Sequence, residues 1–167
     1  MSAERIMGGR IHMPDHADVR VVPPLVYLGA LVLGFLIQWR WPVPLVREKG
    51  IDVFFAIGAV LFVIGVWLVA QALRGFRAAK TSPIPVRPTT ALVLRGPYRY
   101  TRNPMYLGML LVSVGITLGA NALWPLVLVP AVIWIINRYV IVREEKYLSR
   151  KFGGEYEVYK RRTRRWI

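Results

Sequence analysis

The sequence predicts an all-α, polytopic membrane protein with four transmembrane helices, the last two a tight hairpin, followed by a short cytosolic C-terminal helical segment. Hydrophobic residues make up 55% of the 167-residue chain, its mean hydropathy is +0.41, and its net charge of +14 is concentrated between the apolar runs. This pattern favours a membrane protein with basic flanks over a soluble nucleic-acid-binding protein. Cysteine is absent, which excludes disulfides, thiolate nucleophiles and cysteine-ligated metals.

The first 22 residues form a polar tail, which we expect to be flexible or to lie on the membrane surface. Charged residues interrupt this tail and it has no apolar core, so no cleavable signal peptide is expected. His12, Asp15 and His16 have a spacing that suits a metal ion on a helix. Two histidines without a further clear ligand favour an incidental arrangement, and we predict no metal site.

Two apolar runs follow within residues 23–73. Pro23–Trp39 is an uncharged run of 17 residues, and Ile51–Leu73 is a run of 23 residues with one acidic residue near its start. A spanning helix needs about 20 apolar residues, with about 17 as the lower limit, so both runs qualify. Gly58 and Gly65, seven residues apart, lie on one face of the second helix and predict close packing against another helix.

Residues 74–167 form the predicted catalytic region, integrated with the preceding helices in one domain. Its first part, Arg74–Pro104, carries seven basic residues, no acidic residue and five prolines, which favours an extended loop. Gly96 and Pro97 predict a turn, and Asn103 followed by Pro104 predicts a helix start. Three tyrosines and three arginines flank this helix N-terminus, whose free N–H groups suit an anionic ligand group; the alternative is a juxtamembrane loop with an aromatic belt. They are Tyr98, Tyr100, Tyr106, Arg95, Arg99 and Arg102.

Met105–Gly119 and Ala122–Val142 are separated by two residues, which predicts the helical hairpin. Pro130 should kink its second helix because it removes a backbone donor. The side that holds both termini carries 3, 7 and 9 basic residues in its three segments, whereas the opposite side carries 3 in all. The positive-inside rule therefore predicts that both termini and the long loop are cytoplasmic, in a bacterial-type inner membrane.

The fourth apolar helix continues into the charged segment Arg143–Tyr159. Glu144 and Glu145 follow the apolar run at once, where charges are expensive unless they are paired or functional; surface ion pairs are the alternative. On helical spacing Asn137, Glu144, Tyr147 and Lys151 share one face, and Glu145, Leu148 and Phe152 share the next. Gly153-Gly154 should end this helix before a further short one. The terminal KRRTRRW, residues 160–166, predicts an anchor on anionic lipid headgroups.

The ordered pair GPYRYTRNPMYLG and REEKYLSRKFGGEYEVY, separated by an apolar hairpin, resembles the C-terminal catalytic region of a membrane methyltransferase superfamily. This superfamily includes isoprenylcysteine carboxyl methyltransferases and phospholipid methyltransferases. The resemblance covers residue 96 to about residue 162. It implies that S-adenosylmethionine binds at the cytosolic membrane face and leaves as S-adenosylhomocysteine.

Carried over by motif, the resemblance implies specific roles. Arg150 and Glu145 are implied to be catalytic, with Arg150 facing the substrate. Where the family commonly has Arg-His-Pro, this chain has Arg102-Asn103-Pro104, and asparagine cannot take up a proton. A role that needs protonation at Asn103 is therefore in question, whereas cofactor positioning is not. The implied cofactor-binding residues are Tyr98, Arg102, Asn103, Pro104, Tyr106, Leu107, Gly108, Glu144 and Glu145.

The residue types suit this chemistry, because carboxylates and tyrosine rings favour a sulfonium cation and methyl transfer needs alignment above all. The lipophilic acceptor would enter from the bilayer. It is either a carboxylate of an isoprenylcysteine-like compound or an amine of a phospholipid-like compound, and an amine would have to lose a proton, for instance to Glu145 or to a tyrosinate. The alternatives are an NADPH-dependent, sterol-reductase-like membrane enzyme and a membrane scaffold without catalysis.

Overall fold

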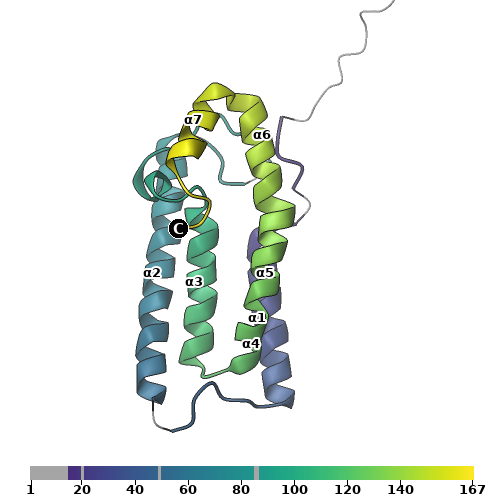
Figure 1. Ribbon diagram of the computed structural model, residues 1–167, viewed down its shortest axis with the longest axis vertical. Helices are drawn as coiled ribbons and strands as arrows, with labels where there is room; N and C mark the ends of the chain where they lie inside the picture. Colours follow the sequence, from purple (N-terminus) through teal and green to yellow (C-terminus); the bar gives the residue numbers. More distant parts are fainter. Residues whose placement is uncertain (1–14, 20, 49, 85–86) are drawn as a thin grey trace, which may run out of the picture.

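The computed structural model describes residues 15–19, 21–48, 50–84 and 87–167, and within these residues the chain is helical with no β-strand. Four long helical segments run along the long axis of the molecule (Figure 1). The fourth, Leu123–Phe152, is a nearly continuous rod made of four consecutive pieces. The elements are α1 (Pro23–Arg40), α2 (Ile51–Ala78), η1 (Gly96–Arg99), α3 (Pro104–Gly119), α4 (Leu123–Val127), α5 (Val129–Ile136), a π-helical turn (Asn137–Ile141), α6 (Val142–Phe152) and α7 (Gly154–Arg162).

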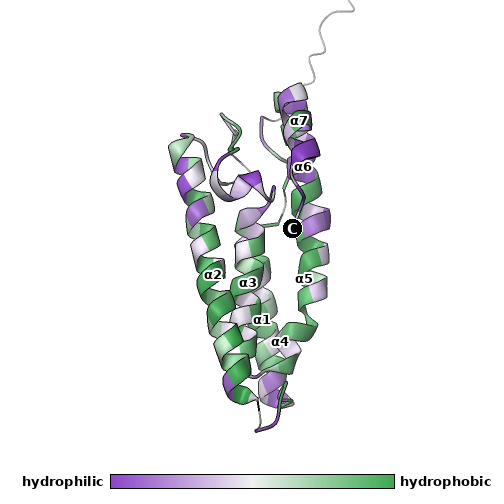
Figure 2. Cartoon of the chain, turned by 60° about the vertical axis from the view of Figure 1, so that its left-hand side comes forward, coloured by the Kyte–Doolittle hydropathy of each residue, from purple (hydrophilic) through white to green (hydrophobic). Residues whose placement is uncertain are grey.

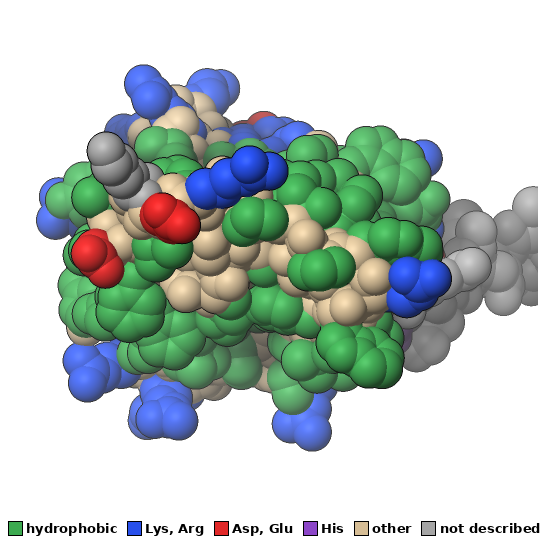
Figure 3. Space-filling model, turned by 90° about the horizontal axis from the view of Figure 1, so that it is seen from below, with side chains coloured by type: hydrophobic (Ala, Val, Ile, Leu, Met, Phe, Trp, Pro, Cys, Tyr) green, Lys and Arg blue, Asp and Glu red, His purple; other side chains and the backbone are tan. Residues whose placement is uncertain are grey.

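The two ends of this bundle differ in composition. Figure 1 shows the α1–α2 connection and the α3–α4 turn at one end, and α6, α7 and the long loop after α2 at the other. Asn121 ties the first end together, since its side chain accepts a hydrogen bond from the Val46 amide (3.0 Å) and donates one to the Val46 carbonyl (2.9 Å). Hydrophobic side chains cover most of that end (Figure 3), whereas α6 and α7 hold many hydrophilic residues (Figure 2).

Among the residues that the structure describes, three helices are long and apolar enough to cross a membrane: α1, α2 and the rod Leu123–Phe152. Helix α3 is equally apolar, but its 16 residues fall just short of the usual minimum of about 17. The structure therefore supports a polytopic, all-helical membrane protein with three spans by length and composition. The predicted first and second spans agree closely with α1 and α2, and the predicted start of the third helix at Pro104 is confirmed.

Helices α2 and α3 approach each other through glycines. A Cβ atom added to Gly65 would lie 2.6 Å from the carbonyl oxygen of Gly108, and one added to Gly58 would lie 2.7 Å from the carbonyl oxygen of Gly115. These separations leave no room for a side chain, so the two backbones are in direct contact. The predicted packing role of Gly58 and Gly65 is confirmed, and their partner is the third helix.

Two boundaries differ from the predicted ones. Helix α2 continues to Ala78, past the predicted end at Leu73, because Arg74 and Arg77 stay exposed while Phe76 turns inward. The fourth helix is interrupted at Leu128, between α4 and α5, two residues before Pro130. A proline clashes with the carbonyl four residues earlier, so the predicted irregularity at Pro130 is confirmed.

The described part of the N-terminal tail lies against α6. Ala17 (1% exposed) and Val19 (8% exposed) join the buried core. Asp15 forms an ion pair with Lys151, and Asp18 forms one with Arg143 (2.9 Å). This part of the tail is therefore packed rather than flexible. His12, of the candidate metal trio, lies outside the described residues.

Candidate functional site

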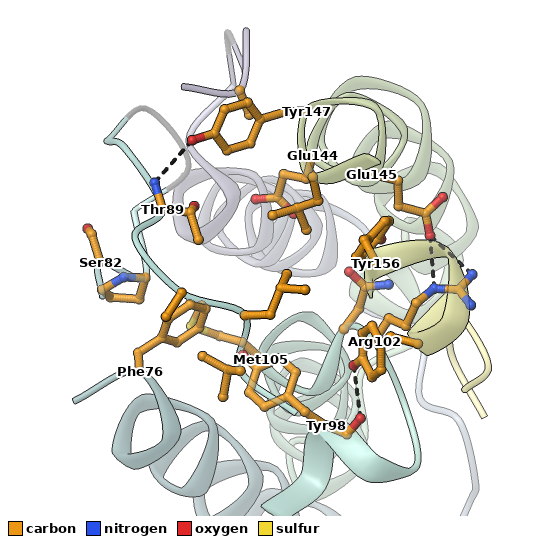
Figure 4. Close-up of a pocket in the computed structure, with 18 of the residues that line it drawn as sticks. Phe76, Ser82, Thr89, Tyr98, Arg102, Met105, Glu144, Glu145, Tyr147 and Tyr156 are labelled. Carbon is orange, nitrogen blue, oxygen red and sulfur yellow. Dashed lines mark hydrogen bonds and ion pairs between the residues drawn. The ribbon is translucent and has the colours of Figure 1, made fainter. Parts of the chain in front are cut away.

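A pocket lies at the charged end of the bundle, where the N-terminal tail, the long loop and several helices meet (Figure 4). Its empty space, including the part open to solvent, is about 830 Å³. The pocket lies beside the N-terminus of α3. It therefore borders both the apolar helices and the hydrophilic end formed by α6 and α7. Its lining comprises Ala17, Phe76, Ser82, Pro83, Ile84, Thr89, Ala91, Leu92, Val93, Tyr98, Arg102, Asn103, Met105, Tyr106, Glu144, Glu145, Tyr147, Leu148, Tyr156 and Tyr159.

Two arginines hold the carboxylate of Glu145. Arg165 donates from Nε to Oε1 (3.1 Å) and from Nη2 to Oε2 (2.5 Å), while Arg102 donates from Nε to Oε1 (3.2 Å). The Glu145 side chain is only 10% exposed, so this geometry satisfies a carboxylate that would otherwise be costly to bury. Figure 4 shows Glu145 turned toward Arg102. Glu145 is thus held in place by positive charge on two sides.

The same arginine ties down the C-terminal segment. Nη1 of Arg102 donates to the backbone carbonyls of Lys160 (2.8 Å) and Thr163, and the Arg102 amide donates to the Arg164 carbonyl (2.9 Å). The side chain of Asn103 donates to the Arg165 carbonyl (2.8 Å). Asn103 is the N-cap residue of α3, but its side chain makes no capping hydrogen bond. Instead it helps hold the segment that carries Arg165.

Glu144 has different surroundings from its neighbour. Its Oε1 accepts a hydrogen bond from the hydroxyl of Tyr106 (2.6 Å), and Tyr106 is fixed in turn, because the Tyr27 hydroxyl donates to its backbone carbonyl (3.0 Å). Within the described residues, Glu144 forms no ion pair. Of the two adjacent carboxylates in the pocket, Glu145 is thus paired with two arginines, whereas Glu144 has a tyrosine hydroxyl and, within the described residues, no cationic partner.

The π-helical turn explains why Asn137 lies with Glu145. Uniform helical spacing predicts Asn137 on the face of Glu144, but Nη1 of Arg165 donates to the Asn137 side chain (3.3 Å) while the same guanidinium binds Glu145. The π turn at Asn137–Ile141 inserts one extra residue into the helix and so rotates everything after it. The predicted shared face of Asn137 and Glu144 is wrong for this reason. The prediction that Tyr147 and Lys151 share a face is confirmed, since both contact Asp15.

Three tyrosines line the side of the pocket formed by η1 and α7. The Tyr159 hydroxyl donates to the Tyr98 carbonyl (2.8 Å), which joins the two elements. Burial raises the pKa of Tyr159 to about 12, and burial also raises the pKa values of Tyr98 and Tyr156. These raised pKa values favour protonated hydroxyls near neutral pH, which can donate hydrogen bonds, and they argue against a tyrosinate at these three positions.

The opposite side of the pocket is closed by Tyr147. Its hydroxyl accepts a hydrogen bond from the Thr89 amide (3.1 Å) and donates one to the backbone carbonyl of Asp15 (3.1 Å). Figure 4 shows the first of these contacts. Ala17, two residues after Asp15, lines the pocket. One side chain of α6 thus joins the long loop to the N-terminal tail beside the cavity.

The structure brings together most, but not all, of the residues that the sequence indicates. Those that line the pocket are Tyr98, Arg102, Asn103, Tyr106, Glu144 and Glu145. Pro104 is buried as the first residue of α3, Leu107 lines a separate groove, and Gly108 packs against α2. Arg150 is exposed on α6 and lies outside the lining.

Sequence reasoning missed Arg165, Tyr156 and Tyr159 as parts of this site. Arg165 belongs to a basic run that looks uniform, and only its contact with Glu145 separates it from its neighbours. Tyr156 and Tyr159 lie on α7, for which the sequence predicts a short helix and no functional role. Their three-residue spacing, which puts both rings on one face of α7, is the signal that could have identified them.

Comparison with known proteins agrees with this geometry. A family model described as phospholipid methyltransferase matches residues 53–155, more than half of the chain, and this range contains all of α3, α5 and α6. An uncharacterized protein of Haemophilus influenzae is 45% identical over 65 residues, which are 38% of this chain and all of that protein. No solved structure matches. The resemblance seen in the sequence is confirmed: the chain belongs to the phospholipid methyltransferase family, within the wider superfamily of membrane methyltransferases.

Proposed function

We propose that this protein is an integral-membrane methyltransferase that takes its methyl group from S-adenosylmethionine and acts on a lipophilic acceptor at the cytosolic membrane face. The observation that carries the proposal is the unequal pair of carboxylates in the pocket. Glu145 is neutralised by Arg102 and Arg165, whereas Glu144 has a hydroxyl donor and, within the described residues, no cation. A pocket with one uncompensated carboxylate favours a positively charged ligand.

The residues present fit S-adenosylmethionine. Glu144 supplies negative charge, Tyr98 and Tyr156 supply ring faces, and Phe76 and Met105 supply apolar walls. When bound, this cofactor supplies a methyl group on a positively charged sulfur. In the proposed site Tyr106 holds the Glu144 carboxylate in place through its hydroxyl.

The same residues argue against NADPH, the cofactor of the reductase alternative. Its phosphates would need arginine or lysine partners. Arg102 is the one such residue among those that line the pocket, and its guanidinium is already engaged by Glu145 and two backbone carbonyls. A pocket without a free cation in its lining suits a cationic cofactor better than a polyanionic one.

The methyl acceptor is proposed to be an amine of a phospholipid-like compound or a carboxylate of an isoprenylcysteine-like compound. An amine must lose a proton before it attacks, and Glu144 is the pocket carboxylate available to accept it, because Glu145 is held by two arginines. A carboxylate acceptor needs no base and would seek an arginine instead. Binding of such a carboxylate by Arg150 stays a prediction. Arg150 is exposed on α6 and does not line the pocket, so it could contact only an acceptor that lies partly outside the pocket.

We propose four membrane crossings, with α3 as the fourth, because α3 carries no charged residue and runs beside α2 through direct glycine contacts. The excess of basic residues in the N-terminal tail, the long loop and the C-terminal segment supports a cytosolic location for the charged end. The pocket would then be open to a soluble cofactor from the cytosol and to lipid from the adjacent leaflet.

A thermal unfolding experiment tests the cofactor assignment. The purified protein in detergent should unfold at a higher temperature with S-adenosylhomocysteine and at an unchanged temperature with NADPH. Stabilisation by NADPH alone would favour the reductase, and stabilisation by neither would favour a scaffold. Incubation with labelled S-adenosylmethionine and a membrane lipid extract then identifies the acceptor by the lipid class that acquires the label.

A further inference from the structure

A second depression, distinct from the pocket, lies on the outer side of α2 and α3. Its empty space, including the part open to solvent, is about 1,540 Å³, and no residue lines both it and the pocket. We call it the lateral groove. Its floor includes Trp67 of α2 and Leu107 of α3, and its rim carries Arg99, Arg162 and Arg164.

The three arginines of the lateral groove are exposed, and within the described residues none of them forms an ion pair. No aspartate or glutamate lines the groove. Positive charge therefore predominates among the side chains that line the groove. Guanidinium groups bind phosphate through paired hydrogen bonds, so this rim is suited to a phosphate-bearing group.

Backbone geometry explains why Arg164 and Arg165 do different things. Thr163 has extended dihedral angles (φ −125°, ψ 144°), and the segment beyond it lies beside Thr101 in a parallel bridge. Successive side chains of an extended chain point to opposite sides. Arg165 therefore points to Glu145, while Arg164 and Trp166 both line the lateral groove.

The position of the groove determines which phosphate it would meet. Trp67 is 56% exposed on α2, a helix long and apolar enough to cross the membrane, so the floor of the groove faces lipid chains. Trp166 lies beside the arginines, as tryptophan does at membrane interfaces. The apolar floor thus lies where the acyl chains of a phospholipid would be, and the basic rim lies where its headgroup would be.

We propose that the lateral groove binds an anionic phospholipid of the surrounding leaflet, with its phosphate on Arg99, Arg162 and Arg164 and an acyl chain along Trp67 and Leu107. This lipid is not the methyl acceptor, because the groove and the pocket have no lining residue in common. By holding Arg164, the lipid stabilises the segment that places Arg165 on Glu145. The proposal does not depend on which cofactor or acceptor the pocket takes.

The test compares wild-type protein with two triple variants in mixed micelles that contain phosphatidylglycerol or phosphatidylcholine. One variant carries Arg99→Gln, Arg162→Gln and Arg164→Gln. The matched control carries Arg77→Gln, Arg87→Gln and Arg161→Gln, which are exposed arginines outside the groove, so both variants lose the same charge. Retained lipid is counted by native mass spectrometry, and thermal unfolding is followed in parallel.

We expect the wild type and the control to retain phosphatidylglycerol in preference to phosphatidylcholine, and the groove variant to retain it about tenfold less well. Equal loss in both variants, or no preference in the wild type, would overturn the proposal. If the groove variant fails to fold, Trp67→Ala replaces it in the test, and this substitution should weaken retention of phosphatidylglycerol. A wild type stabilised as well by inorganic phosphate as by the lipid would also contradict the proposal, since the apolar floor would then contribute nothing.

Discussion

Glu145 and Arg165 form a two-point contact, with Nε and Nη2 of the arginine at 3.1 and 2.5 Å from the two carboxylate oxygens. These residues lie on different elements, α6 and the segment after α7, so their contact fixes the C-terminal end of the chain against the fourth long helix. Arg102 completes the arrangement from the start of α3. One buried carboxylate thereby joins three parts of the chain at one wall of the pocket.

Replacing Arg165 tests whether this contact positions the pocket wall. Arg165→Ala should lower the unfolding temperature, because hydrogen bonds to a charged group each contribute about 1.5–3 kcal/mol when partly buried. It should also weaken binding of S-adenosylhomocysteine, as measured by titration calorimetry. Arg165→Lys should recover part of the stability, since lysine keeps the charge but lacks the paired donors.

Arg161→Ala is the matched control for Arg165, because Arg161 is exposed and lies outside the pocket. It should leave the unfolding temperature and the affinity unchanged. If Arg165→Ala behaved like Arg161→Ala in both measurements, the contact with Glu145 would have no positioning role.

The sequence contains enough information to predict the helices and one wall of the pocket. Asn103-Pro104 and Gly153-Gly154 mark boundaries through local backbone chemistry, so the start of α3 and the end of α6 could be predicted from a few residues. Glu144 stands out because it lies only two residues beyond an apolar run. These signals are local, and tertiary contacts did not override them.

The arrangement around Glu145 could not be predicted in this way. The π turn at Asn137–Ile141 shifts the register of the fourth helix, and none of the residue types in this turn predicts a π turn. Arg164 and Arg165 are chemically identical, and only the extended backbone and its partners decide that one faces outward and the other inward. Both features arise from packing between segments distant in the sequence.

The close contact of α2 and α3 makes a prediction about stability. Gly65→Ala places a Cβ atom 2.6 Å from the Gly108 carbonyl oxygen, so the helices must separate, at a cost of about 1–3 kcal/mol. Thermal unfolding in detergent should show a lower midpoint for this variant. Gly29→Ala, on α1, has no atom within 4 Å of its new Cβ and should be neutral or stabilising. Equal midpoints for the two variants would contradict the direct backbone contact.

The Tyr147 hydroxyl makes a prediction about local opening. Tyr147→Phe removes the hydrogen bonds to the Thr89 amide and to the Asp15 carbonyl, so both segments should open more often. Hydrogen exchange measured by mass spectrometry should rise about 2- to 10-fold in peptides that cover Thr89 and Asp15. Tyr139→Phe, at an exposed tyrosine with no hydroxyl contact to the described residues, should leave exchange in these peptides unchanged, and an equal rise in both variants would argue against this role.

The central claim is that the pocket binds a positively charged methyl donor through Glu144. The most direct measurement is titration calorimetry of S-adenosylmethionine and S-adenosylhomocysteine with the wild type and Glu144→Gln in nanodiscs. Loss of one carboxylate near the sulfonium should weaken S-adenosylmethionine about tenfold, and S-adenosylhomocysteine, which lacks that charge, distinctly less. Equal weakening of both ligands would contradict the charge role of Glu144, and absence of binding by the wild type would contradict the methyltransferase assignment itself.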